Sequence, residues 1–308
     1  MLEFLHLLAT ATLPIFAISA VGFWMARTGR VDQCDAEGVN VFALRVAVPA
    51  LVFRLLAEAD FAVYDWGVLG AYLAAEIAVY ALTFALCRFV LGVETREALM
   101  LGMCAIFVNG VFFVLPIASL LYGAEAEQVI TGIVVIDSTL IFGGSILLMD
   151  LLGREGAGMG RIVVRFAANP MILGMAAGVG VSLTGLTLPQ GVLTYVGFVG
   201  DAAAPAALFA LGVILAKAKL AEGRRVVPIV IGMKMLIHPL VTFLLLGALT
   251  VGGAWSATAL LFTAGPAGAM PFVIALSYGI RTERIALVVI VTTLISLITL
   301  PGVALLGG

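Results

Sequence analysis

Six ionisable residues lie inside long apolar stretches of the sequence, away from the ends of those stretches: Arg45, Glu76, Asp137, Asp201, Lys234 and His238. A charge inside an apolar helix is costly and marks a candidate functional site. A lone carboxyl group in a dry site favours its protonated form and can carry a proton near neutral pH. Asp137 and Asp201 are therefore the predicted proton carriers. His238 shares a helix face with Lys234 and precedes Pro239, so it can bond to the backbone instead of titrating.

A second set of residues predicts two interrupted helices. Proline removes a helical hydrogen-bond donor and glycine lets the chain unwind, which frees backbone N–H and C=O groups for a ligand. Two half-helices that begin near mid-membrane would direct their positive N-terminal ends at one anion, such as a carboxylate. Prolines that merely kink the helices are the alternative, but their symmetric occurrence favours a site. Its predicted substrate contacts are Asn109, Gly110 and Pro116 in one stretch and Gly265, Pro266 and Pro271 in the other.

The composition shows what must position these residues, because a chain of this kind dissolves in lipid. Of its 308 residues 63% are hydrophobic and 11% are charged, against roughly 25% charged residues in soluble proteins. Stretches of about 20 apolar residues predict membrane-crossing helices. Ten such spans are predicted, at 7–26, 38–57, 66–91, 97–121, 128–150, 168–186, 191–216, 226–250, 254–279 and 284–305. The predicted fold class is an all-α polytopic membrane protein whose short loops hold no soluble domain.

Several classes of function are excluded. A net charge of −2 provides no basic surface for nucleic acid. The cysteines Cys34, Cys87 and Cys104 are too scattered for a disulfide framework or a zinc site. Metal-ligand spacings, nucleophile motifs and phosphate-binding loops are lacking, so we expect neither an enzyme nor a cofactor. The small-residue motif from Gly174 to Gly178 indicates close helix packing and is compatible with a homodimer without specifying one.

The basic residues predict the orientation. Of the 16 Lys and Arg residues, 13 lie in loops that follow odd-numbered spans, and such loops face the cytoplasm under the positive-inside rule. The loops on the other side carry acidic residues, among them Glu58 and Glu125. Both termini are therefore predicted to lie outside, in the periplasm.

The two halves of the sequence resemble each other, which indicates an internal duplication. Pro14 and Pro49 recur as Pro170 and Pro205 at a shift of 156, and Pro116 recurs as Pro271 at a shift of 155. Each half holds five spans, so the second half enters the membrane from the opposite side, as in many secondary transporters. The predicted parts are an N-terminal repeat at 1–152, a cytoplasmic linker at 153–166 and a C-terminal inverted repeat at 167–308.

The duplication also sorts the charges. Arg45 and Asp201 are 156 positions apart, and Lys234 lies two positions from the equivalent of Glu76. Opposite charges thus occupy corresponding places in the two halves. Structural ion pairs would offset the cost of burying them, and for Glu76 with Lys234 this explanation is as good as a functional one.

These features resemble the auxin efflux carrier family, which includes plant auxin exporters and bacterial carriers such as malonate transporters. The resemblance covers nearly the whole chain and rests on five motifs: Ala47 to Phe53, Asn109 to Pro116, Asn169-Pro170, Ala204 to Gly212 and Leu294 to Pro301. It implies ten spans in two inverted five-helix repeats, broken helices 4 and 9 that cross, and an organic anion as substrate. Phe112 and Phe113 depart from the small residues common in the family at that place, and the short central loop differs from the long loop of the plant exporters.

We therefore expect a secondary active transporter of a bacterial inner membrane. It would move a small organic anion, such as a carboxylate or dicarboxylate, by alternating access, with coupling to protons or to the membrane potential. One alternative is a sodium-coupled symporter similar in fold to the bile-acid symporters, in which free carbonyls would hold sodium with Asn109, Thr131 or Ser138. A second alternative is a non-transporting membrane receptor or scaffold, although the small loops give a partner little to bind.

Overall fold

The computed structural model describes residues 13–152, 164, 167–217, 225–249 and 253–306. These residues form helices and short connections, and the β-type pairing recorded among them is an isolated antiparallel bridge between Val108 and Ala267. Helices satisfy their own backbone N–H and C=O groups, which lipid cannot do. The predicted all-helical fold class is confirmed at this level.

Six helices within the described residues are long and apolar enough to cross a membrane: Gln33–Ala57, Trp66–Val90, Glu125–Met149, Gln190–Ile214, Val226–Ala248 and Glu283–Leu300. They correspond to predicted spans 2, 3, 5, 7, 8 and 10. Spans 4 and 9 are interrupted in mid-length, span 6 is the shorter apolar helix Pro170–Thr184, and span 1 falls partly outside the described residues. The number of ten crossings stays a prediction.

The helices form two compact units. Of the described residues, unit 1 combines 13–14, 65–152, 225–249 and 253–306, and unit 2 combines 15–64, 164 and 167–217. Each unit thus takes helices from both halves of the sequence. Division into repeats and division into compact units are separate properties, and the repeat boundaries stay a prediction. The predicted linker 153–166 lies outside the described residues, apart from Val164.

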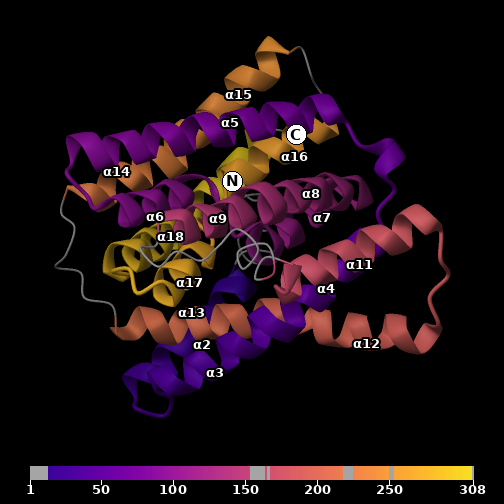
Figure 1. Ribbon diagram of the computed structural model, residues 1–308, viewed down its shortest axis with the longest axis horizontal. Helices are drawn as coiled ribbons and strands as arrows, with labels where there is room; N and C mark the ends of the chain where they lie inside the picture. Colours follow the sequence, from indigo (N-terminus) through magenta and orange to yellow (C-terminus); the bar gives the residue numbers. More distant parts are fainter. Residues whose placement is uncertain (1–12, 153–163, 165–166, 218–224, 250–252, 307–308) are drawn as a thin grey trace. The chain divides into compact units, whose positions relative to one another are not determined.

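Unit 2 packs its helices closely through glycine. The described elements are α2 (Leu13–Arg27), α3 (Gln33–Phe42), η2 (Ala43–Ala47), α4 (Val48–Ala57), η3 (Phe61–Val63), α11 (Pro170–Thr184), α12 (Gln190–Asp201) and α13 (Ala203–Lys217). α4 lies along α11 and contacts α12, and α3 contacts α13 (Figure 1). A Cβ atom added to Gly174 would lie 2.6 Å from the carbonyl oxygen of Pro49, so α11 and α4 require glycine there to approach so closely.

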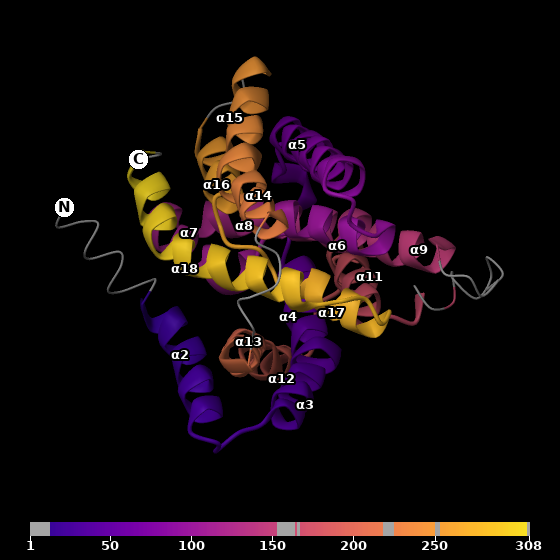
Figure 2. The ribbon, with the colours of Figure 1, turned by 90° about the vertical axis from the view of Figure 1, so that its left-hand side faces the viewer.

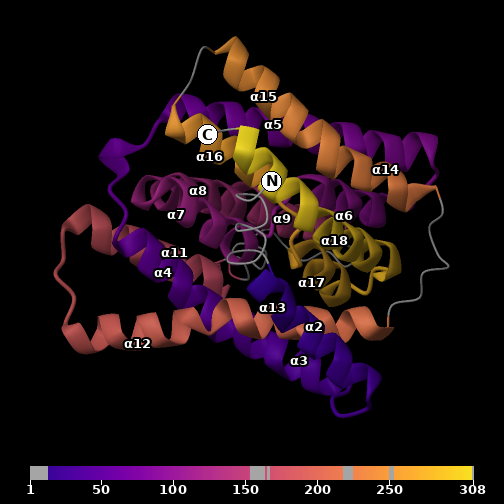
Figure 3. The same cartoon turned by 180° about the vertical axis from the view of Figure 1, so that it is seen from behind.

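Unit 1 holds the interrupted helices. Its first part contains α5 (Trp66–Ala85), η4 (Leu86–Val90), α6 (Thr95–Ile106), η5 (Gly110–Val114), α7 (Leu115–Tyr122), α8 (Ala124–Ile136), η6 (Asp137–Phe142) and α9 (Gly143–Leu152). Its second part contains α14 (Val226–Gly232), η7 (Met233–Ile237), α15 (His238–Ala248), α16 (Ala254–Thr263), α17 (Met270–Ser277) and α18 (Glu283–Leu306). α16 lies beside α8 and α15 (Figure 2), and α5 runs along α15 (Figure 3).

Side chains at the helix starts explain why several of these helices begin where they do. The carboxylate of Asp65 accepts hydrogen bonds from the backbone N–H groups of Gly67 and Val68, which caps α5. Asn169 caps α11 in the same way through Met171 N–H. Such caps satisfy donors that a helix cannot satisfy itself.

Within the described residues, five segments adopt the wider π-helical turn: η2, η4, η5, η6 and η7. Arg45 lies in η2, Asp137 begins η6 and Lys234 lies in η7. π-Helical turns are rare and occur frequently at functional sites. Three of the six ionisable residues singled out in the sequence therefore stand in locally widened helix.

Candidate functional site

The two interrupted helices of unit 1 meet at the isolated bridge. Asn109 N–H donates to the carbonyl of Pro266 at 2.9 Å, and Gly268 N–H donates to the carbonyl of Phe107 at 2.8 Å. These bonds flank the pairing of Val108 with Ala267. They satisfy backbone groups that an unwound helix would otherwise leave bare in an apolar interior. We call this meeting point the crossing.

Glycine makes the crossing possible, because apolar side chains occupy the space beside it. A Cβ atom on Gly110 would lie 2.0 Å from the ring of Phe262. On Gly265 it would lie 2.6 Å from the side chain of Val114, and on Gly268 2.8 Å from the ring of Phe107. The broken stretches are therefore packed with side chains.

The structure brings four of the six predicted substrate contacts together at the crossing: Asn109, Gly110, Gly265 and Pro266. Asn109 is buried, with 8% of its surface exposed. Pro116 and Pro271 are each the second residue of the following half-helix, α7 and α17. Pro271 thus lies in a first turn, where its missing N–H leaves no intrahelical bond unmade, whereas Pro116 follows the π-helical segment η5 directly.

The crossing is unequal on its two sides. Eight positions separate Val108 from Pro116, whereas four separate Ala267 from Pro271. The π-helical segment η5 accommodates the longer stretch. On the other side, Ala267 N–H donates to the hydroxyl of Thr292 on α18 at 3.1 Å, which fixes the shorter stretch.

A buried polar group lies in the same unit. The hydroxyl of Tyr72 is 2.7 Å from Glu76 Oε1 and 3.0 Å from Asp137 Oδ1. All three side chains are buried, with Asp137 3% exposed and the other two 0% exposed. Tyr72 and Glu76 are one helical turn apart on α5, and Asp137 reaches them from the start of η6. We call Tyr72, Glu76 and Asp137 the tyrosine–carboxyl group.

Lys234 and His238 lie next to this group. The ammonium of Lys234 donates to the carbonyl of Thr263 at 2.8 Å and lies 3.2 Å from His238 Nδ1. Thr263 is the last residue of α16, so the cation sits at the negative end of that helix. Among the described residues no ion pair within 4.0 Å joins Lys234 to a carboxylate. The cation is fixed by the backbone of the interrupted helix.

The remaining charged candidates lie in unit 2. Asp201, the last residue of α12, is ion-paired with Arg54 at 2.9 Å, and its side chain is 68% exposed. Arg45 is exposed in η2, and no ion pair to it is recorded in the described part of the chain. The structure therefore places Asp137, Glu76, Lys234 and His238 together and Asp201 in different surroundings.

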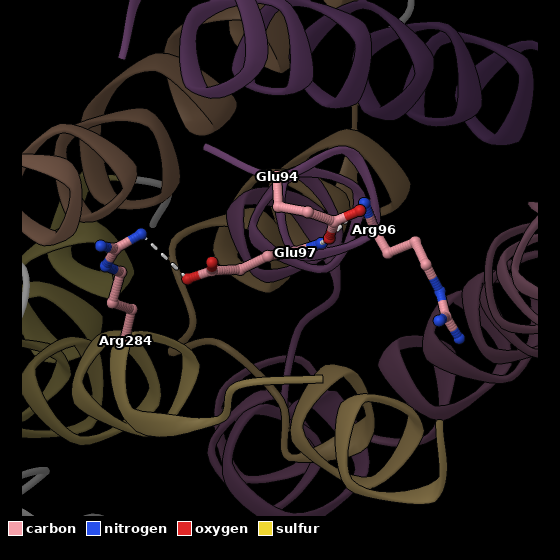
Figure 4. A network of polar contacts seen from close by, with 4 residues as sticks. All are labelled: Glu94, Arg96, Glu97 and Arg284. Carbon is pink, nitrogen blue, oxygen red and sulfur yellow. Dashed lines mark hydrogen bonds and ion pairs between the residues drawn. The ribbon is translucent and has the colours of Figure 1, made fainter. Parts of the chain in front are cut away.

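A further polar network ties the start of α6 to α18. Arg284 is 3.1 Å from the buried carboxylate of Glu97, and Glu94 caps α6 by accepting from the backbone of Arg96 and Glu97 (Figure 4). Figure 4 shows the side chain of Arg96 extending away from this pair. Its guanidinium reaches the carbonyl of Tyr278, just after α17, at 3.3 Å.

Sequence reasoning overlooked Tyr72, Thr292 and Arg54 as members of these arrangements. For Tyr72 a signal existed, because Tyr72 and Glu76 stand four apart in an apolar stretch and so share a helix face. Arg54 lies near the end of its span, where arginine commonly extends toward water. Among the described residues no cluster of three His, Cys, Asp or Glu residues could hold a metal ion.

Comparison with known proteins identifies the family to which the chain belongs. A model of the family described as "Membrane transport protein" matches residues 7–158 and 159–304. A protein of Rhizobium meliloti named "Putative malonate transporter" is 30% identical over 94% of this chain and 92% of its own length. An "Uncharacterized transporter" of Methanothermobacter thermautotrophicus is 25% identical over 94% of this chain and 95% of its own length. The chain belongs to this membrane transport protein family, the auxin efflux carriers that its motifs resemble, and is an integral membrane transporter and not an enzyme.

Proposed function

We propose that the protein is a secondary active transporter that moves a small organic anion, a carboxylate or dicarboxylate, across a bacterial inner membrane by alternating access. The observation that carries the proposal is the crossing, where two broken helices meet and Asn109 is buried. Transport would be coupled to protons or driven by the membrane potential, with both termini outside.

The donors at the crossing suit a carboxylate. The N-terminal ends of η5 with α7 and of α17 lie beside the bridge, and the first N–H groups of a helix have no partner within that helix. The amide of Asn109 adds further donors and an acceptor. These donors are neutral, and an anion held by dipoles alone can be released again, as a carrier requires.

The size of the anion is limited by the apolar side chains at the crossing. Phe262, Val114 and Phe107 fill the spaces beside the three glycines. The name of the Rhizobium meliloti relative refers to malonate, a compact dicarboxylate. Malonate is therefore the first substrate to test.

Reciprocal contacts in unit 2 support the inverted repeat on which alternating access would depend. A Cβ on Gly22 would lie 2.3 Å from the carbonyl oxygen of Phe209, and a Cβ on Gly178 would lie 2.7 Å from that of Phe53. Gly22 and Gly178 are 156 positions apart, and so are Phe53 and Phe209. Exchange of the two halves thus turns one contact into the other, as in a twofold-symmetric interface.

The test is uptake of labelled malonate by proteoliposomes that contain the purified protein. We expect the wild type to accumulate malonate. Uptake by Asn109→Ala should be reduced at least about tenfold, since a hydrogen bond to a charged group contributes roughly 1.5–3 kcal/mol. The matched control is Asn40→Ala on α3, which removes the same side chain from unit 2 and should leave uptake unchanged. Equal uptake by the wild type and Asn109→Ala would reject the site.

The same vesicles separate the alternatives. Uptake that a protonophore abolishes and that continues without sodium would support proton coupling, whereas dependence on sodium would favour the symporter. A protein that transports no carboxylate but is thermally stabilised by one would be a receptor, because a ligand of the native state raises its stability.

A further inference from the structure

The tyrosine–carboxyl group has more acceptors than one hydroxyl can serve. A tyrosine has a single hydroxyl hydrogen, yet Glu76 Oε1 and Asp137 Oδ1 both lie within hydrogen-bond distance of it, at 2.7 and 3.0 Å. If both carboxyls were ionised, one carboxylate would face the lone pairs of the phenol oxygen with no proton between them. A proton on one carboxyl removes this repulsion, because that carboxyl can then donate to the phenol oxygen.

The distances from the Tyr72 hydroxyl to the two carboxyls differ. Hydrogen bonds from a hydroxyl to a carboxylate are shorter than neutral ones, at about 2.5–2.7 Å. The contact of Tyr72 with Glu76 falls in that range, and the contacts with Asp137 at 3.0 and 3.3 Å do not. The contacts therefore describe one proton shared by the two carboxyls through Tyr72, and Glu76 Oε2 has no hydrogen-bond partner within the described residues.

The net charge of the buried cluster also favours a single protonated carboxyl. An ammonium has only donors, so His238 Nδ1 accepts from Lys234 and the imidazole is neutral with its hydrogen on Nε2. One ammonium and one carboxylate then leave the buried cluster neutral. Two carboxylates would leave an uncompensated charge, which is costly in a dry interior.

The other elements that contact α5 carry charges that include Arg88 on η4, Glu97 on α6 and Glu127 on α8. Within the described residues, none of these is among the groups that act electrostatically on Glu76 or Asp137. α16 contributes Phe262, Thr258 and Thr263, whose side chains carry no charge. Lys234, from η7, and His238, from α15, are the basic groups near the carboxyls.

We propose that Glu76 and Asp137 hold one exchangeable proton between them through the hydroxyl of Tyr72, and that this is the proton the carrier uses. On release, the O–H bond of the protonated carboxyl breaks and the proton passes to water on one side of the membrane; on uptake it returns from water on the other side. Asp201 takes no part. The use of the proton rests on the proposed transport function, whereas its presence does not.

One ring contact joins this group to the crossing, and the neighbouring Lys234 makes a second link. The rings of Tyr72 and Phe262 meet edge to face with centroids 5.9 Å apart, and Phe262 fills the space beside Gly110. Lys234 holds the last carbonyl of α16, just before the unwound stretch. A change in the protonation of the carboxyls therefore alters the charge beside Tyr72 and Lys234, and these two residues contact the crossing.

Infrared spectroscopy of the purified full-length protein tests the proposal without any substrate. In a detergent that lacks ester groups, at neutral pH, we expect the C=O stretching band of one protonated carboxylic acid per protein, shifted in D₂O. Asp137→Asn and Glu76→Gln should each abolish the band, because the carboxyl that remains then ionises as the single partner of Lys234. Asp201→Asn is the matched control and should leave the band unchanged.

Tyr72→Phe guards against a failure of the carboxyl variants to fold. It keeps the ring but removes the shared hydroxyl, so we expect the band to persist at a different frequency. A wild type without the band, a band that survives in both Asp137→Asn and Glu76→Gln, or a band unmoved in Tyr72→Phe would overturn the proposal. Malonate uptake is a separate readout: a band without uptake would reject the proposed function alone.

Discussion

A Cβ atom added to a closely packed glycine would clash with different kinds of atom in the two units. In unit 2, a Cβ on Gly212 would lie 1.9 Å from the backbone oxygen of Ser19, and one on Gly22 would lie 2.3 Å from that of Phe209. In unit 1, a Cβ on Gly110 would lie 2.0 Å from the side-chain ring of Phe262. Helix backbone cannot move aside without shifting the helix, whereas a side chain can change its rotamer. Unit 2 is thus tied together by contacts that cannot yield locally, and the crossing of unit 1 by contacts that can.

This difference suits a transporter whose binding site lies at the crossing. A binding site that must open and close benefits from side chains that repack, because packed interiors switch between discrete arrangements. Close backbone contacts between small residues hold membrane helices together when no hydrophobic force does. The comparison therefore predicts that the same substitution, glycine to alanine, has different consequences in the two units.

The largest expected effect is that of Gly212→Ala in unit 2. The added methyl group meets the backbone of α2, so we expect a loss of about 3 kcal/mol of stability, the upper end of overpacking effects. Thermal unfolding of the purified protein in detergent measures it. Gly180→Ala on α11, where a Cβ would meet nothing within 4 Å, is the control and should be neutral or slightly stabilising. Equal unfolding temperatures for both variants would remove the basis of the comparison.

A smaller effect with a different signature is expected for Gly110→Ala in unit 1. Its methyl group meets the ring of Phe262, which should cost about 1–3 kcal/mol and reduce malonate uptake. Truncation of that ring in Phe262→Ala relieves the clash, so the double variant should lose less stability than the sum of the two single losses.

The corresponding double variant in unit 2 shows whether the distinction holds. Ser19→Ala leaves the backbone oxygen that Gly212 faces in place, so its loss should add to that of Gly212→Ala. Coupling of similar size in both double variants would mean that side chains limit the approach in unit 2 as well.

The sequence predicted the crossing better than it predicted the charges. Glycine and proline within the same apolar stretch, in two stretches, were sufficient to locate Asn109, Gly110, Gly265 and Pro266, because unwinding is a local property of those residue types. It was not sufficient to pair Glu76 with Asp137, which requires the rotation of two helices about their axes.

The π-helical turns explain part of that limit. Asp137 and Lys234 both stand in such turns, where the side-chain direction departs from the 3.6-residue period that sequence patterns use. Depth within a span was equally uninformative for Asp201. It lies well inside span 7 in the sequence, yet its side chain is largely exposed and pairs with Arg54.

The smallest effect is therefore expected for Arg54→Gln. An ion pair with an exposed carboxylate contributes about 1 kcal/mol or less, and salt screens it. Thermal unfolding at low and high salt should show a small loss that salt abolishes, in contrast to the buried tyrosine–carboxyl group. A loss above about 2 kcal/mol that salt does not change would show that the pair is shielded from water. Asp201 would then lie in dry surroundings, as Asp137 does, and would again be a candidate proton carrier.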